Sequence, residues 1–123
     1  MLEAYSLNAT VTAESPIPFN SVALVKGGTA VLASPTTVEL NKRGVYMVSF
    51  NGTAAASDTV QLYKDGVAQS QAQSTGTSLS FTTLVQCDRD NSCCCCASPV
   101  TLQVVSESAA TLSDANIVVT KIC

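Results

Sequence analysis

The sequence contains no histidine and no tryptophan, and charged residues make up only 12% of its 123 positions. Without histidine, the chain lacks the usual general base, the Ser-His and Cys-His nucleophile systems, and every zinc site that uses imidazole. The low charge indicates either that hydroxyl side chains keep the surface hydrated or that part of the surface is buried against identical copies of the chain. We favour burial against identical copies.

Long apolar runs and targeting signals are also missing. Nowhere do about 18 apolar residues follow one another, so membrane insertion is not expected. The opening Met1-Leu-Glu-Ala-Tyr5 lacks the basic and apolar regions of a signal peptide. A length of 123 residues predicts a single domain covering residues 1–123. A protein of this kind reaches the outside of a cell without a signal peptide if it is part of a larger particle that lysis releases.

The charge balance argues against nucleic acid as a partner. Six basic residues stand against nine acidic ones, which gives a formal net charge of −3. The basic residues are scattered, with one adjacent pair at Lys42-Arg43, whereas binding to a phosphate backbone needs clustered Lys and Arg. The sequence therefore predicts no enzyme activity and no cofactor, and its function has to be inferred from its architecture.

Strand patterns recur at short intervals along the chain, and helix patterns are nearly missing. Tyr5, Leu7, Ala9 and Val11 alternate with polar residues, which predicts a strand with one apolar face. The strongest pattern places Tyr46, Val48 and Phe50 on one face of a strand. In all, the spacing predicts about eight to ten short strands, from segments 5–11, 22–25, 30–33, 38–40, 45–50, 59–64, 67–73, 79–86, 100–104 and 117–122. This pattern is typical of an all-β sandwich.

Turn residues divide these segments. Asn41 to Gly44 predicts a turn before the strongest strand, and Asn51-Gly52 is expected to end that strand. Asp65-Gly66 favours a two-residue hairpin turn. The strand that returns from this turn, 67–73, has no strongly apolar face, so we expect it at the edge of a sheet.

The order of segments resembles the C1q/TNF-like jelly roll. The resemblance rests on Gly44-Val-Tyr-Met-Val-Ser-Phe50, the hairpin Val60-Gln-Leu-Tyr-Lys-Asp-Gly-Val67, the strands 78–85 and 100–105, and a final apolar strand. It covers nearly the whole chain and is similar to short bacterial and phage-borne versions, such as heads of collagen-like spore-surface proteins and small prophage-encoded proteins. It implies an antiparallel two-sheet jelly-roll sandwich that assembles as a homotrimer.

This resemblance implies a non-enzymatic structural role. We expect a trimeric surface decoration or head-fibre protein of a phage virion, made in the bacterial cytoplasm and displayed on the virion surface. Its partners would be capsid or other virion proteins. The alternative is a receptor- or carbohydrate-binding adhesion head on a phage tail or on a bacterial spore or cell surface, with a host surface glycan as partner. Three copies would combine weak contacts through avidity.

Four aromatic residues are expected in the core or in the trimer interface. They are Tyr5, Tyr46, Phe50 and Phe81. Their alternation with polar neighbours favours burial over contact with a receptor.

Six cysteines are the most reactive side chains of the sequence, at Cys87, Cys93, Cys94, Cys95, Cys96 and Cys123. Their spacing does not match the pairs of standard zinc motifs. Three interpretations remain open. The cysteines are buried thiols with one or two local disulfides, or they form bonds between subunits, or the run from Cys93 to Cys96 contributes thiolates to a soft metal ion on the threefold axis.

Overall fold

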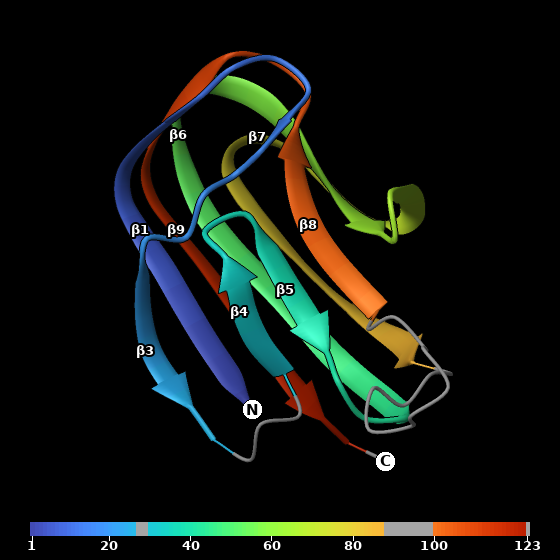
Figure 1. Ribbon diagram of the computed structural model, residues 1–123. Helices are drawn as coiled ribbons and strands as arrows, with labels where there is room; N and C mark the ends of the chain where they lie inside the picture. The colour runs from blue at the N-terminus through green and yellow to red at the C-terminus, as the bar shows by residue number, and fades with distance from the viewer. Residues whose placement is uncertain (27–29, 88–99, 123) are drawn as a thin grey trace.

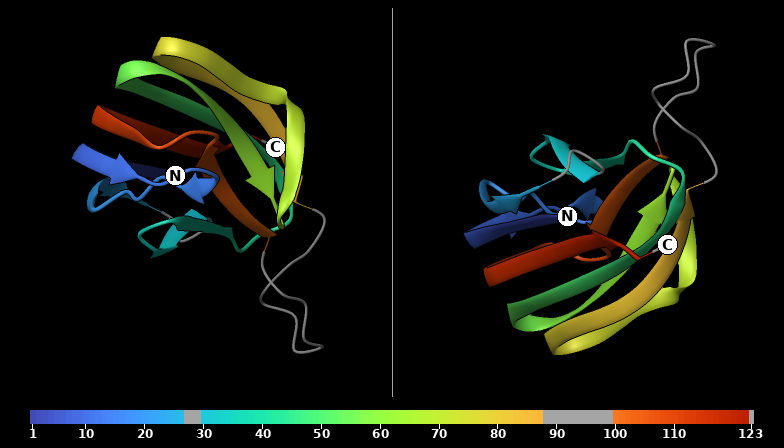
Figure 2. Two further views of the ribbon diagram at one scale, coloured as in Figure 1. Left: turned by 90° about the horizontal axis from the view of Figure 1, so that it is seen from above. Right: turned by 90° about the horizontal axis from the view of Figure 1, so that it is seen from below.

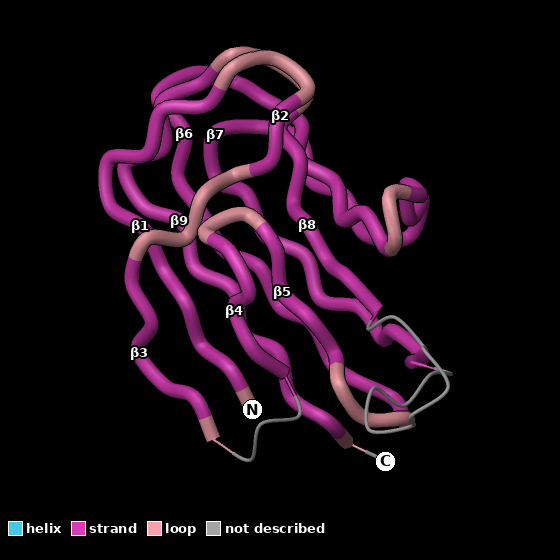
Figure 3. The backbone as a smooth tube through the Cα atoms, viewed as in Figure 1, coloured by secondary structure: helices cyan, strands magenta, loops and turns pink. Residues whose placement is uncertain are grey.

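The structure is a computed structural model, and it describes residues 1–26, 30–87 and 100–122 (Figure 1). All regular secondary structure in these ranges is β-strand (Figure 3). The nine strands are β1 (Leu2–Val11), β2 (Ser15–Pro16), β3 (Ser21–Val25), β4 (Ala30–Ser34), β5 (Thr37–Leu40), β6 (Gly44–Lys64), β7 (Val67–Cys87), β8 (Val100–Ser106) and β9 (Ala110–Lys121). The predicted number of strands is therefore confirmed.

The strands form two layers, and the long strands β6 and β7 each run through both of them (Figure 2). In the first layer, the first half of β6 pairs with β9 and with the second half of β7, and β1 and β3 follow beyond β9. In the second layer, the second half of β6 pairs with β8 and with the first half of β7, and β5 and β4 follow beyond β8. All these pairs are antiparallel, so the predicted antiparallel two-sheet sandwich is confirmed.

The core lies between the layers and follows the alternation of the sequence. Tyr46, Val48 and Phe50 of β6 are fully buried, as the alternation predicts, while the residues between them point outward. The ring of Phe50 stacks on Phe81 with centroids 5.5 Å apart and meets Phe19 edge-on at 6.3 Å. The Tyr46 hydroxyl donates a 2.7 Å hydrogen bond to the carbonyl of Lys42, which satisfies its polar end. One aromatic cluster therefore joins β6, β7 and the segment before β3.

The hairpin between β6 and β7 confirms the predicted turn. Asp65 and Gly66 have φ of 52° and 80°, and a type I′ turn requires a positive φ at both central positions. The Asp65 carboxylate also accepts a 3.0 Å hydrogen bond from the backbone N–H of Thr101 in β8. Within the part of the chain that the structure describes, β7 pairs with β6 alone, so the predicted edge position of 67–73 is confirmed.

Replacing Gly66 by alanine is expected to lower the free energy of unfolding by about 1–2 kcal/mol. A Cβ at this position would meet no atom within 4 Å, so the whole cost comes from the left-handed backbone. Urea unfolding measures the change. Gly66→Asn is the control, because asparagine tolerates this conformation, and an equal loss in both variants would contradict the explanation.

The expected end of a strand at Asn51-Gly52 is wrong, because β6 continues through both residues to Lys64. Gly52 pairs with Leu79 on one side and with Ala115 on the other. A Cβ on Gly52 would stand 3.1 Å from the carbonyl oxygen of Asp114 and 3.2 Å from the ring of Phe50. The glycine is therefore required by close packing inside the sheet, and it is not a terminator.

The predicted apolar face of the first strand is also partly wrong. Ala9 and Val11 are buried, but Leu7 is exposed and Tyr5 is half-buried on the outer side, while Ala4 points inward. Asn8 has φ of 56°, and the inward side changes at this residue. The alternation of β9 changes at the same level of the sheet, so the two paired strands turn together.

A buried carboxylate marks the bend where β6 passes from the first layer to the second. Asp58 is 5% exposed and accepts hydrogen bonds from the N–H of Thr59 at 2.8 Å and from the N–H of Ser108 at 3.1 Å. It also accepts a hydrogen bond from the hydroxyl of Ser106, which is fully buried. This network holds β6 against the end of β8.

Candidate functional site: the outer face of the first layer

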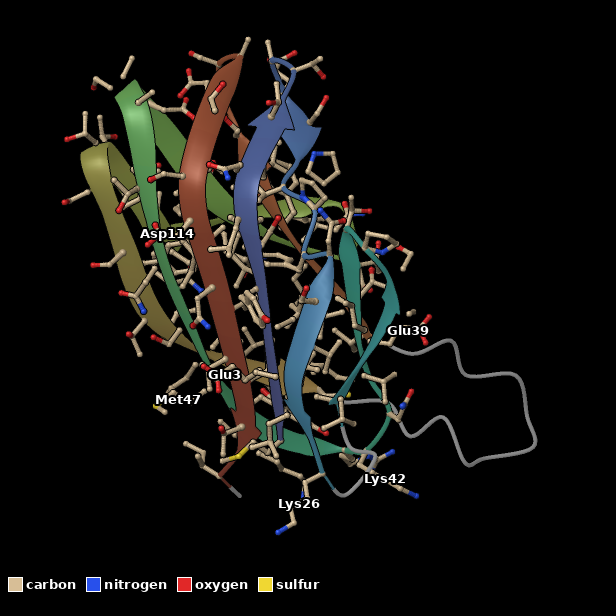
Figure 4. The ribbon with its side chains drawn as sticks, turned by 90° about the vertical axis from the view of Figure 1, so that its left-hand side faces the viewer. Glu3, Lys26, Glu39, Lys42, Met47 and Asp114 are labelled. Carbon is tan, nitrogen blue, oxygen red and sulfur yellow. The ribbon has the colours of Figure 1, made fainter. Side chains whose placement is uncertain are left out.

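The outer face of the first layer carries exposed apolar side chains. Leu7 on β1 is 65% exposed and Leu84 on β7 is 58% exposed. Met47 lies directly opposite Leu84 in the β6–β7 pair and is half-buried, as is Val118 of β9. Isolated exposed apolar residues are ordinary, but here exposed or half-buried apolar residues recur on β1, β9, β6 and β7 of one sheet. Figure 4 shows Glu3, Met47 and Asp114 on three of these strands.

A hollow crosses the same face near Gly52. It has a volume of about 550 Å³ and is lined by residues of all four strands, including Tyr5, Leu7, Asn51, Thr53, Ser78 and Asp114. The pairing places Leu7, Asp114, Thr53 and Ser78 in one row across the sheet. The lining mixes hydroxyl and amide groups with apolar atoms, so the hollow can receive a segment that offers both.

Carboxylates supply the charge of this face. Asn116 lies beside Tyr5 in the β1–β9 pair, and its amide donates a 3.1 Å hydrogen bond to Glu3. Asp114 is exposed at the hollow. The face offers apolar contact area, hydrogen-bonding groups and carboxylates, which are the features of a surface that can bind a partner.

The edge beside this face carries no charge. From Gly66 to Cys87 the sequence contains no Asp, Glu, Lys or Arg. Sheet edges that face water are usually protected by charged side chains, proline or bulges. β7 forms the edge of both layers on this side, so the exposed apolar residue Leu84 belongs to a long uncharged edge strand.

The aromatic residues selected from the sequence separate into two groups. Tyr46 and Phe50 are fully buried and Phe81 is 8% exposed, so all three lie in the core. Tyr5 lies on the outer face, at the hollow. The sequence patterns did not indicate that an outer face carries Leu7, Met47, Leu84 and Val118. The signal that could have indicated this face is the presence of apolar residues at positions of these strands where alternation predicts polar, outward-facing residues.

Of the six cysteines, Cys87 lies within the described residues. It is buried at the end of β7, and its sulfur is 3.8 Å from the carbonyl oxygen of Leu40. Cys93, Cys94, Cys95, Cys96 and Cys123 lie outside the described residues, so the three interpretations of the cysteines stay open. Among residues 1–26, 30–87 and 100–122, no group of three or more Cys, Asp or Glu side chains is arranged to hold a metal ion. The same residues include no helix of the length and apolarity that a membrane crossing needs.

Comparison of the structure with solved structures identifies the fold. The globular domain of zebrafish complement 1qA protein has a TM-score of 0.73 at 11% sequence identity, with 99% of this chain and 96% of that chain covered. Murine APRIL has a TM-score of 0.66 at 14% identity, with 97% and 96% covered. Rabbit GITRL has a TM-score of 0.62 at 11% identity, with 100% and 95% covered. The fold is the C1q/TNF-like jelly roll. No family model and no curated protein matches the sequence.

At identities of 11 to 14%, the likeness concerns the fold and leaves the function to be argued from the faces of this chain.

Proposed function

We propose that the protein is a non-enzymatic structural head that assembles as a homotrimer and decorates the surface of a phage particle. The observation that carries the proposal is the outer face of the first layer, where Leu7 on β1 is 65% exposed and Leu84 on the uncharged edge strand β7 is 58% exposed. Only 12% of the residues are charged, so few charged side chains are available to keep an exposed apolar face hydrated.

The face and the edge are different surfaces, which determines the kind of assembly. When an edge of one copy contacts the face of the next, the contact is heterologous, and it generates a ring if the rotation closes. A threefold ring covers, in each chain, the outer face and the part of the β7 edge that lies in the first layer, residues 78–87, and leaves no open contact. The resemblance to trimeric jelly-roll heads supports three as the number that closes.

The double substitution Met47→Lys/Leu84→Lys is expected to abolish the trimer. The two residues lie opposite each other on β6 and β7, so two like charges would be placed together where the edge and the outer face meet. Light scattering at micromolar concentration should give a single-chain mass of 12.7 kDa, with the circular dichroism of a folded β protein.

Val67→Lys is the matched control, because Val67 is also apolar and 62% exposed but lies at the tip of the Asp65-Gly66 hairpin. This variant should keep the mass of the unsubstituted protein. An unchanged mass in the double variant, or an equal loss in Val67→Lys, would contradict the assignment of the contact.

The place on the particle is tested by immunogold labelling of phage particles released from the strain that encodes the protein. Label on the capsid is the expected result. Label confined to the tail, together with binding on a glycan array, would support the alternative of an adhesion head. Absence of the protein from purified particles would contradict both versions of the virion role.

A further inference from the structure

A second cavity lies on the outer face of the second layer, on the other side of the sandwich from the face discussed above. It has a volume of about 230 Å³, and its lining consists of Glu14, Thr59, Gln61, Tyr63, Val105 and Glu107. The neighbouring residues Val60, Leu62 and Val104 point into the core, which places the lining on the outside. The cavity therefore stays open when the first layer is covered.

The backbone brings two carboxylates together at this cavity. Ser15 of β2 pairs with Ser106 of β8 in an antiparallel pair. Glu14 precedes Ser15 and Glu107 follows Ser106, so the register places these two residues opposite each other. The N–H of Glu107 donates a 2.8 Å hydrogen bond to the carbonyl of Thr59, which fixes this position beside β6. Like charges directly opposite each other destabilise a pair of strands.

No basic residue of the described segments lines the cavity, and the structure shows no ion pair to either carboxylate there. The remaining lining is suited to a planar cation. Tyr63 provides an aromatic ring. Thr59 provides a hydroxyl that shares a 2.8 Å hydrogen bond with the hydroxyl of Thr75, and Gln61 an amide that donates to the carbonyl of Gln69 at 3.2 Å. A ring together with two uncompensated carboxylates attracts a guanidinium group through cation–π and charge-assisted contacts.

We propose that this cavity binds an arginine side chain of a partner protein. The volume of about 230 Å³ is below that of pockets for whole small-molecule ligands and is sufficient for one long side chain. A guanidinium can donate to both carboxylates at once, which a compact ammonium does less well. A trimer would present three such cavities on its outer surface, so weak single contacts would add up.

The test uses Nα-acetyl-arginine methylamide as probe and follows the amide signals of the protein by NMR. The probe should shift the signals of Glu14, Thr59 and Glu107 and the side-chain amide of Gln61. The citrulline analogue, which has the same shape without the charge, should not. Equal shifts with citrulline, shifts of these signals by methyl α-glucoside instead, or no shift at the cavity would each overturn the proposal.

Three single variants refine the test. Glu14→Gln and Glu107→Gln should each weaken probe binding by about tenfold, because each removes a charge-assisted hydrogen bond. Glu39→Gln removes one carboxylate from β5 in the same layer, outside the cavity, and should leave the affinity unchanged. If all three variants weakened probe binding equally, the net charge of the protein would explain the result, and the proposed arginine site would be rejected.

The two cavity variants are expected to fold, because each removes one of two like charges that line the same cavity. Their thermal midpoints should be no lower than that of the unsubstituted protein. Probe binding should also persist in Met47→Lys/Leu84→Lys, since these residues lie on the opposite layer. Failure of the trimer and failure of the arginine site are therefore separate outcomes.

Discussion

Phe50→Ala is expected to lower the free energy of unfolding by about 3–5 kcal/mol, among the largest effects of any single substitution in this chain. The ring is fully buried, and it contacts Phe81 of β7 and Phe19 of the segment before β3. Its removal opens a cavity where segments distant in the sequence meet. Urea unfolding measures the change at a fixed chain concentration, because association adds to the apparent stability.

Phe50→Leu is the control for this prediction. Leucine keeps most of the apolar contact but cannot stack on Phe81, so its loss should be clearly smaller than that of alanine. A loss below about 1 kcal/mol in Phe50→Ala would mean that the aromatic cluster does not hold the layers together.

Asp58→Ala is expected to lower the free energy of unfolding by about 2–4 kcal/mol. The substitution leaves the N–H groups of Thr59 and Ser108 without their acceptor, and the buried hydroxyl of Ser106 loses one of its two acceptors, keeping the carbonyl oxygen of Ser108 at 2.7 Å. Unpaired buried donors cost more than the lost bonds themselves contribute. The same urea experiment measures the change, and the loss should appear without disruption of the aromatic cluster.

Two further variants define the origin of this effect. Asp58→Asn keeps an acceptor oxygen and the shape of the side chain, so it should be less destabilising than alanine. Ser57→Ala changes the exposed neighbour in the same strand and should stay within about 0.5 kcal/mol of the unsubstituted protein. Equal stability of Asp58→Ala and Ser57→Ala would show that the buried carboxylate is dispensable.

Much of the fold could be predicted from the sequence, because alternation has a direct physical cause. Tyr46, Val48 and Phe50 point inward as their spacing requires. The Asp65-Gly66 turn forms because both positions need a positive φ, which glycine and aspartate tolerate. These features depend on neighbours in the chain, and a local pattern is enough to find them.

Other features depend on distant contacts and could not be predicted. Gly52 resembles a turn residue in the sequence, but it lies within β6 because Phe50 and the Asp114 carbonyl need its space. The alternation of β1 changes at Asn8, whose φ is 56°, and Leu7 lies on the outer face. Asp58 has no motif around it, and its partners on and after β8 lie about fifty positions away.

The outer face of the first layer could not be predicted from the sequence for the same reason. Met47 and Leu84 occupy ordinary positions in their own strands, and they form a patch because the β6–β7 register places them opposite each other. The low charge of the chain led to the expectation that some surface is covered, and the structure places Leu7 and Leu84 on this face among its exposed apolar residues, which also include Val22, Leu24 and Val25 of β3.

The most direct test of the proposed assembly is sedimentation equilibrium of the unsubstituted protein at micromolar concentration. Three chains that cover one another's apolar faces should sediment as one species with three times the 12.7 kDa mass of the chain. A stable species of 12.7 kDa at this concentration would show that Leu7 and Leu84 stay in water, and it would contradict the account.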